Sequence, residues 1–388
     1  MGDTTESKLL DTPLVPPSAD AQIEFLVNIQ RLLKEGAFVA TYKYALLAAL
    51  ADLCVEKGDD TGNPLQLQIS EIAEKFVVYY WRQTIPYIPP SAAETKNGKI
   101  LRQNTGSQAE IVRSIARIRE DYRDVQSLRR GAPREWSRLV NAVSATVIKQ
   151  PLWKLQRVGN EYLEFLYSDA GKTNTIVLKD GVAFCFRKFH QLVTDLVRES
   201  WARYIRRFNH SVLGTTTDLH EFLFGTDRVP LGEYIPILWD LQKGSCFYCG
   251  QVLRQSSTDV DHFIPWAVYP FDLGHNFVLA HEHPCNSKKA DMLASADHLN
   301  RWAERNAALK DELRSRFDSA HVVHNLGVST RIAQWAYQQT FATKGLTWKG
   351  GNELVHLPVN WRVSLDELIE VVQKRNFLGR VRHSLNPR

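Results

Sequence analysis

Three of the five cysteines fall in one short stretch of the chain, and two histidines lie close to the third of them. Cys246 and Cys249 form a Cys-x-x-Cys pair, which can place two thiolates on one metal ion through a tight turn. A second pair of ligands can come from Cys285 and either His281 or His283. An intracellular Cys₃His set of this kind suits tetrahedral Zn²⁺, so the sequence predicts a structural zinc site.

A second polar set lies inside this zinc frame, made of Asp259, Asp261, His262, Asn276 and Asn286. Asp261 is a hard oxygen ligand suited to Mg²⁺ or Mn²⁺, and His262 is a base that can take a proton near neutral pH. The two asparagines add a neutral oxygen ligand and a group able to orient the imidazole. Adjacent strand residues point to opposite faces, so the ion must lie at a strand end, before the bend that Pro265 imposes. The set predicts a metal-assisted hydrolase.

The segment resembles the HNH, or ββα-metal, endonuclease family in its zinc-containing form. That family has Cys-x-x-Cys, then Asp-His-hydrophobic-x-Pro, then Asn with an apolar pair, then a second Cys-x-x-Cys followed by Asn-x-x-Lys. The matching segments occur here in the same order, at residues 246–249, 261–265, 276–279 and 285–289. The chain departs from the pattern at the second Cys-x-x-Cys, where His281 stands in the place of the first cysteine. That register favours His281 over His283 as the fourth zinc ligand.

The resemblance implies a catalytic role for four residues of the polar set. His262 is the expected general base, which activates water for in-line attack on the scissile phosphate. Asp261 and Asn286 are expected to hold one Mg²⁺ or Mn²⁺ ion against that phosphate and the leaving 3′-oxygen. Asn276 is expected to orient the base through the loop backbone.

The resemblance also implies a substrate, which is double-stranded DNA. Lys288 or Lys289 is expected to contact a backbone phosphate, and the expected products carry a 5′-phosphate and a 3′-hydroxyl. One site of this kind cuts one strand, so cutting both strands needs a homodimer or two events. We expect Asp259, two residues before Asp261, to be a solvated turn residue.

Apolar periodicity predicts the elements that must position these residues. Stripes at helical spacing predict helices near residues 23–33, 42–53, 72–79, 111–125, 136–148, 192–205 and 297–317. Residues 65–69 predict a short strand. Strand-like runs on both sides of Asp180-Gly181 predict a β-hairpin near residues 160–188, because both turn positions favour positive φ.

These elements define an α+β chain in three parts. A leader over residues 1–18 precedes a mainly helical recognition or regulatory region over 19–235, which carries the hairpin. Residues 236–388 are expected to form the zinc-bound nuclease domain, with its core at 246–291 and a helical C-terminal extension.

Composition excludes several classes. The 388 residues include 48 Lys and Arg against 43 Asp and Glu, and 44% are hydrophobic, as in an ordinary soluble protein. No secretory signal or membrane-length apolar run is visible, which predicts a cytoplasmic protein without a membrane partner. We therefore predict a DNA endonuclease, of a kind that fits bacterial restriction or anti-phage defence. Two alternatives remain: an effector nuclease gated by a partner protein or a nucleotide signal, and a non-catalytic zinc-containing nucleic-acid-binding protein.

Overall fold

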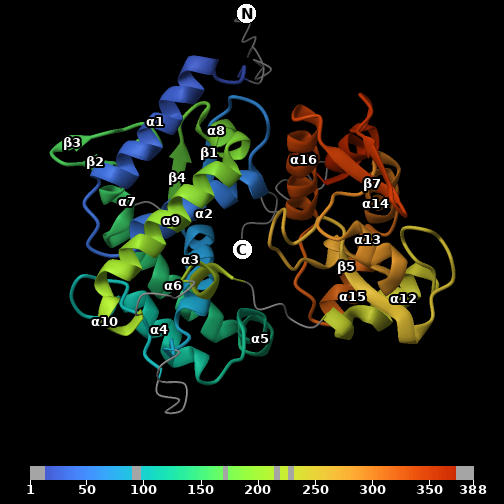
Figure 1. The fold of residues 1–388 in the computed structure, drawn as a ribbon, viewed down its shortest axis with the longest axis horizontal. Coiled ribbons are helices and arrows are strands. Elements are labelled where there is room, and N and C mark those ends of the chain that lie inside the picture. The colour runs from blue at the N-terminus through green and yellow to red at the C-terminus, as the bar shows by residue number, and fades with distance from the viewer. Residues whose placement is uncertain (1–13, 90–97, 169–173, 214–218, 226–230, 373–388) are drawn as a thin grey trace, which may run out of the picture. The chain divides into compact units, whose positions relative to one another are not determined.

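The computed structural model describes residues 14–89, 98–168, 174–213, 219–225 and 231–372 (Figure 1). The chain divides into two compact units, residues 1–226 and 227–388. This division lies a little N-terminal to the boundary predicted near residue 235. Each unit combines helices with two-stranded sheets, so the α+β class is confirmed. Within the described residues, no helix is long and apolar enough to cross a membrane.

The N-terminal unit is built around α2, which is apolar on almost every side. Leu46, Leu47 and Leu50 of α2 are fully buried, as expected for a helix at the centre of a core. The helix packs against α3, α8 and α9. The described helices of this unit are α1 (Ala19–Glu35), α2 (Tyr42–Lys57), α3 (Ile69–Gln83), α4 (Glu110–Arg119), α5 (Val125–Gly131), α6 (Pro133–Lys149), α7 (Pro151–Lys154), α8 (Val182–Lys188), α9 (His190–Phe208), α10 (His210–Leu213) and α11 (Leu219–Phe224).

The predicted hairpin around Asp180-Gly181 is wrong. Gly181 has a φ of +74° and immediately precedes α8, so the run after it is helical. The strand before it, β4 (Thr175–Leu178), pairs antiparallel with the distant β1 (Leu65–Gln68). A much smaller hairpin forms from β2 (Arg157–Val158) and β3 (Glu161–Tyr162). The left-handed glycine was correctly expected, but it ends a strand and begins a helix.

Two helices predicted as continuous are interrupted. The first divides into α4 and α5 because Asp124 starts a new helix, its side chain accepting a hydrogen bond from the backbone N–H of Ser127 at 2.7 Å. The second divides at Leu309 into α14 (Ala296–Ala308) and α15 (Lys310–Ser319). Apolar spacing continues across both breaks, so periodicity alone could not locate them.

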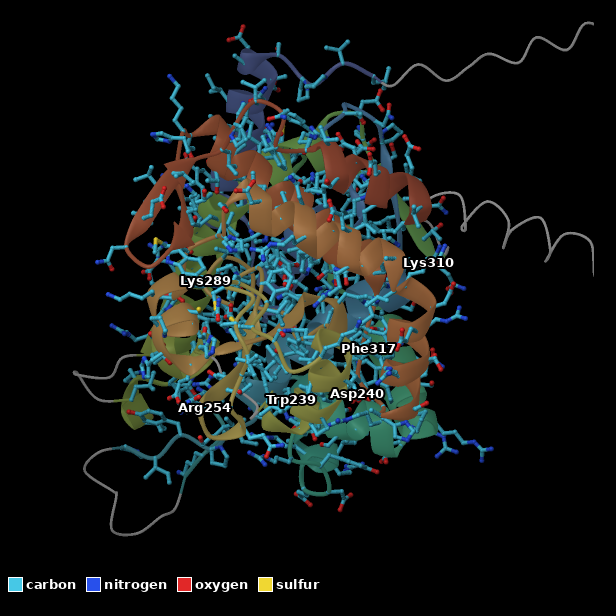
Figure 2. The ribbon with its side chains drawn as sticks, turned by 90° about the vertical axis from the view of Figure 1, so that its right-hand side faces the viewer. Trp239, Asp240, Arg254, Lys289, Lys310 and Phe317 are labelled. Carbon is cyan, nitrogen blue, oxygen red and sulfur yellow. The ribbon has the colours of Figure 1, made fainter. Side chains whose placement is uncertain are left out.

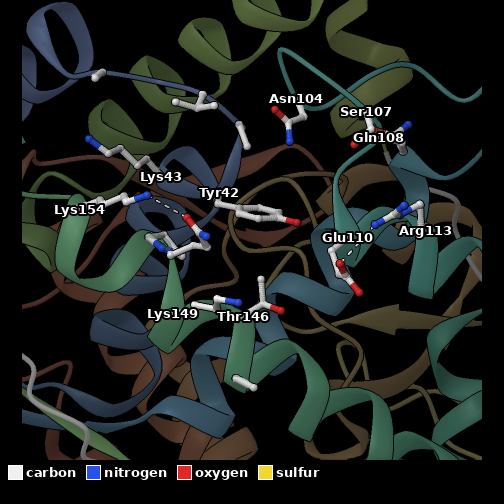
Figure 3. Close-up of a pocket in the computed structure, with 16 residues that line it drawn as sticks. Tyr42, Lys43, Asn104, Ser107, Gln108, Glu110, Arg113, Thr146, Lys149 and Lys154 are labelled. Carbon is white, nitrogen blue, oxygen red and sulfur yellow. Dashed lines mark hydrogen bonds and ion pairs between the residues drawn. The ribbon is translucent and has the colours of Figure 1, made fainter.

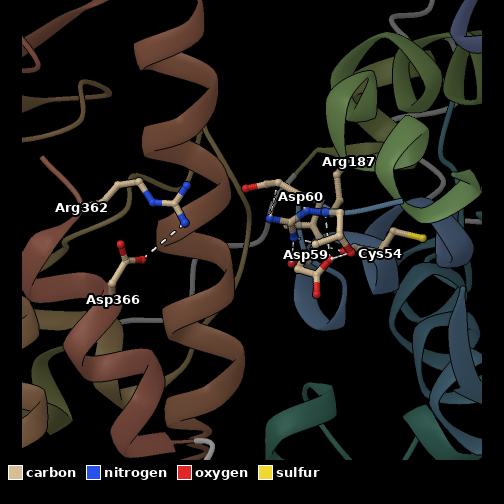
Figure 4. Close-up of polar contacts among 8 residues, drawn as sticks. Cys54, Asp59, Asp60, Arg187, Arg362 and Asp366 are labelled. Carbon is tan, nitrogen blue, oxygen red and sulfur yellow. Dashed lines mark hydrogen bonds and ion pairs between the residues drawn. The ribbon is translucent and has the colours of Figure 1, made fainter. Parts of the chain in front are cut away.

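A buried arginine of α8, Arg187, connects this helix to the C-terminal end of α2 (Figure 4). Arg187 is only 1% exposed, and it donates hydrogen bonds to the backbone oxygens of Cys54, at 3.2 Å, and Val55, at 2.8 Å. It also pairs with Asp60 at 3.1 Å. A cation at the last carbonyls of a helix is favoured by the helix dipole, so this contact stabilises the core of the N-terminal unit.

The C-terminal unit combines two antiparallel two-stranded sheets with a set of helices. Strands β5 (Thr258–His262) and β6 (Phe277–His281) form one sheet, and β7 (Leu346–Gly350) and β8 (Glu353–His356) form another. Its α-helices include α12 (Ile235–Gln242), α13 (Ser287–Lys289), α14, α15 and α16 (Leu326–Ala342), and residues 363–372 are also helical. Figure 4 also shows an ion pair of this unit, Arg362 with Asp366 at 3.3 Å.

Candidate active site

The β5–β6 hairpin fixes where the predicted catalytic residues lie. Asp261 pairs with Val278, and His262 pairs with Phe277 at the end of the sheet. Asn276 lies just before β6 and is fully buried. Its side chain accepts a hydrogen bond from the backbone N–H of Ile264 at 2.8 Å and donates one to the oxygen of the same residue at 3.0 Å. Asn276 therefore clamps the chain immediately after His262.

His262 is held by a carboxylate that the sequence analysis missed. Its Nε2 lies 2.7 Å from Oδ1 of Asp272. Trp266 and Phe277 pack against the imidazole edge-on, with ring centroids 5.3 Å and 5.2 Å away. An ionised carboxylate can only accept a hydrogen bond, so Nε2 carries a proton, and in the neutral ring Nδ1 is the nitrogen with the lone pair. Asp272 lies in a loop with no periodic pattern, so its spacing from His262 gave no signal.

Asp261 forms a buried cluster with Tyr248 and Lys289. The Tyr248 hydroxyl donates a hydrogen bond to Oδ2 of Asp261, and the Lys289 ammonium lies 3.0 Å from the same oxygen. Lys289 also donates to the backbone oxygen of His262 at 3.0 Å. Burial, followed by the nearby Asp261 carboxylate, raises the pKa of Tyr248, so its hydroxyl stays a donor. The cluster therefore holds the Asp261 carboxylate and the backbone of His262 in place.

Lys289, which is labelled in Figure 2, does not occupy the phosphate-facing position expected for it. Its side chain is 0% exposed, and an ammonium paired with a buried carboxylate is not available to a DNA backbone. Lys288 is exposed, and it donates a hydrogen bond to Oδ1 of Asn352 at 3.0 Å. Of the two lysines, only Lys288 keeps the predicted accessibility. The helix that carries both, α13, is three residues long and ends at Ala290, which has a φ of +45°.

Asn286 reaches the hairpin through Asp259. Its amide donates a hydrogen bond to Oδ2 of Asp259 at 2.7 Å. Asp259 and Asp261 are two residues apart on β5, and alternate strand residues share a face. The structure therefore brings Asn286 to the Asp261 face of the strand, although through a carboxylate that we expected to be a solvated turn residue.

A cysteine and histidine cluster lies beside this hairpin. Cys246, Cys249, His281 and Cys285 each offer one ligand atom, and these atoms lie within 4.8 Å of one another. Nδ1 of His281 is 3.4 Å from the Cys249 sulfur and 4.0 Å from the Cys285 sulfur. His283 is outside the group, with its Nε2 3.9 Å from Glu282.

The donor atoms of this cluster fit a metal ion such as zinc. Nε2 of His281 lies 3.3 Å from the Val252 carbonyl oxygen, which can only accept, so the lone pair of Nδ1 faces the sulfurs. Burial and the neighbouring sulfurs of Cys246 and Cys249 raise the pKa of Cys285. Thiols crowded in this way ionise readily only beside a cation. The group could therefore hold a metal ion without rearrangement of His281.

Helix α14 holds the Cys-x-x-Cys turn in place. Arg301 donates hydrogen bonds to the backbone oxygens of Phe247, at 3.1 Å, and Tyr248, at 3.0 Å. Gly250 completes the turn with a φ of +72°, a conformation that side chains disfavour. The turn joins the hairpin through a hydrogen bond from the Phe247 N–H to the Leu279 oxygen, at 2.9 Å. A hydrogen bond therefore connects the turn that carries Cys246 and Cys249 to the hairpin that carries Asp261 and His262.

Comparison with known proteins assigns most of the N-terminal unit to a protein family. A family described as "Domain of unknown function (DUF8808)" matches residues 22–223. The match covers more than half of the 388 residues, and the chain belongs to this family. No curated protein and no solved structure matches the chain. The hairpin and the cysteine cluster lie outside the matched residues.

Proposed function

We propose that the chain is a metal-dependent HNH endonuclease that hydrolyses phosphodiester bonds in double-stranded DNA. The observation that carries the proposal is the pairing of His262 with Asp272 at the end of a strand that also bears Asp261. A neutral imidazole with its Nδ1 lone pair free is the state that a general base needs. Asp272 orients the ring and stabilises the imidazolium that forms when His262 takes a proton from water.

Asp261 and Asn286 are the proposed ligands of a catalytic Mg²⁺ or Mn²⁺ ion. Tyr248 and Lys289 both contact Oδ2 of Asp261, and within the described residues no group donates a hydrogen bond to Oδ1. The side-chain oxygen of Asn286 is a neutral hard ligand. The hydrogen bond from its amide nitrogen to Asp259 fixes the orientation of the amide. When bound, such an ion supplies charge stabilisation for the phosphate and the leaving oxygen.

The Cys₃His group has a structural part in this proposal. Zn²⁺ held by four protein ligands leaves no open position for catalysis. Its role would be to join the Cys-x-x-Cys turn to the end of β6 and the segment that carries Asn286. The N-terminal unit, which precedes the nuclease module, would select the target or gate the activity.

The ends of the cleavage products test the reaction class. We expect a labelled DNA duplex to be cut in Mg²⁺ or Mn²⁺ but not in excess chelator, leaving 3′-hydroxyl and 5′-phosphate ends that a DNA ligase can rejoin. Asn286→Ala should slow cleavage by about a hundredfold, because a ligand and its orientation are lost. Asn360→Ala, which removes an exposed amide of the same unit outside the proposed site, should have no effect. Cleavage in chelator that leaves 3′-phosphate ends would contradict the proposal.

A further inference from the structure

The N-terminal unit contains a cavity of about 620 Å³ whose lining is strongly basic (Figure 3). It is formed by the first turn of α2, the loop before α4, the end of α6 and α7. Ligand pockets in proteins commonly have volumes of about 300–1,000 Å³. The cavity therefore has room for a small molecule of the size of a nucleotide. All of its lining residues belong to the family-matched region and none belongs to the proposed nuclease site.

The cations of the cavity outnumber its acids. Lys43, Lys149, Lys154 and Arg113 line it, against the single carboxylate of Glu110. Glu110 is already paired with Arg113, at 3.2 Å. Within the part of the chain that the structure describes, none of the three lysines lies within ion-pair distance of a carboxylate. Lysines gathered in this way repel one another until an anion joins them.

Lys43 is the most telling member of the group, because it is only 7% exposed. Its ammonium lies 5.3 Å from the centre of the Phe38 ring and 3.5 Å from the backbone oxygen of Arg157. Burial, with the positive charges of Lys154 and Arg157, lowers the pKa of Lys43 to about 8. A buried ammonium normally has a charged partner. Among the described residues Lys43 has no such partner, and an anion in the cavity would supply it.

The backbone also makes the electrostatic potential of the cavity more positive. Lys43 is in the first turn of α2, and Glu110 is the first residue of α4, so the N-terminal ends of two helices lie at the cavity. Helix N-termini carry partial positive charge and favour phosphate groups. A cation in the first turn of a helix is unfavourable by the same rule, which makes Lys43 costly unless an anion binds beside it.

We infer that this cavity binds a small molecule that carries at least two phosphate groups, such as a nucleoside polyphosphate. The phosphates would lie against Lys43, Lys149 and Lys154. Figure 3 shows these lysines on one side of the cavity and the polar side chains of Asn104 and Ser107 on the other. The second side also carries the Glu110–Arg113 ion pair, and its neutral hydrogen-bonding groups are available for the rest of the ligand.

Calorimetric titration of the full chain tests this inference, with ATP, pyrophosphate and adenosine as probes and no divalent ion present. We expect ATP to bind at one site per chain and adenosine not to bind. Pyrophosphate binding as tightly as ATP would mean that the cavity recognises phosphate alone. Weaker pyrophosphate binding would mean that the nucleoside is also recognised.

Lys149→Gln with Lys154→Gln should weaken ATP binding by at least about tenfold, because two charge-assisted contacts are lost. Lys34→Gln with Lys188→Gln is the matched control, since it removes two exposed lysines of the same unit and should change the affinity less than twofold. Both lysines of the test pair are at least partly exposed, so the variant should fold.

Three results would overturn the inference. One is no binding of ATP or pyrophosphate at about 1 mM, and another is equal loss in the two double variants. The third is tight binding of a short DNA duplex that depends on Lys149 and Lys154 while the small phosphates do not bind. None of these outcomes depends on cleavage, so they leave the nuclease proposal as it stands.

Discussion

At the scale of single residues, the account depends on how His262 is held. In the proposed mechanism Asp272 is a positioning residue, because its contact is with the imidazole of His262. Asp272→Asn should lower the turnover rate of DNA cleavage by about ten- to a hundredfold and leave DNA affinity unchanged, since an amide can no longer hold the ring in the required tautomer. Single-turnover cleavage and a binding titration measure the two effects separately.

A matched control for this variant exists in the same unit. Asp318 accepts a hydrogen bond from Nε2 of His324 at 2.9 Å, outside the proposed site. Asp318→Asn should therefore cleave at the wild-type rate. If Asp272→Asn weakens DNA binding and turnover alike, Asp272 contributes to folding or binding and not to the orientation of His262.

The choice of the fourth metal ligand is also decided by one residue. His281→Ala should lose most of the bound zinc, because three thiolates and an open position hold the ion more weakly than a complete set. His283→Ala should keep one zinc ion per chain, since His283 is exposed and outside the cluster. Metal analysis of the dialysed proteins measures both. Zinc retained by His281→Ala and lost by His283→Ala would reverse the assignment.

Residue types and spacing were enough to predict the Cys₃His cluster, because a metal site requires specific ligands at limited separations. They predicted that Asn276 acts on the backbone next to His262, and the hydrogen bonds to Ile264 are of that kind. They could not predict Asp272, nor the pairing of Lys289 with Asp261. Both are contacts between loops or short segments whose relative position depends on tertiary packing.

At the scale of elements, a hydrogen-bonded carboxylate links three helices of the N-terminal unit. Asp52 of α2 lies 2.8 Å from Nε2 of His190 on α9 and accepts a hydrogen bond from the Tyr79 hydroxyl of α3 at 2.6 Å. Burial would raise the pKa of Asp52, but the hydrogen bond to His190 and the charge of Lys75 outweigh it and lower the pKa to about 2. The folded state therefore favours the carboxylate form.

This shift has a definite sign in stability. The ordinary pKa of Asp52 is 3.8, so its stabilising effect is fully present above that pH and is lost as the pH falls through about 2. Asp52→Asn should lower the free energy of unfolding by about 2 kcal/mol at pH 7, and by progressively less between pH 4 and pH 2. Urea denaturation over this range measures the difference. The exposed Asp195→Asn is the control, and a loss that does not vary with pH would refute the assignment.

Apolar periodicity located most of the helices because each buries one stripe. It failed at Gly181, where a positive φ fits a helix start as well as a hairpin turn. It also failed to pair β4 with β1, which are separated by more than a hundred residues. Strand pairing over that distance is decided by packing and leaves no local pattern in the sequence.

At the scale of the whole molecule, the chain combines a family domain without known function and a module that carries the proposed catalytic residues. The nuclease proposal and the polyphosphate-binding inference concern different units, so either can be wrong while the other holds. The single nuclease site proposed for each chain also predicts the order of products. Supercoiled plasmid should first become nicked circles, and linear DNA should appear later, because a single site cuts one strand at a time.

Cleavage of supercoiled plasmid DNA by wild type and His262→Ala, in Mg²⁺ and in Mn²⁺, is the most direct test of the central claim. His324→Ala, which changes a histidine of the same unit outside the site, is the control. We predict nicking by the wild type and the control, and at least about a hundredfold slower nicking by His262→Ala, since the general base is lost. Equal cleavage by all three proteins, or no cleavage by any of them, would contradict the account.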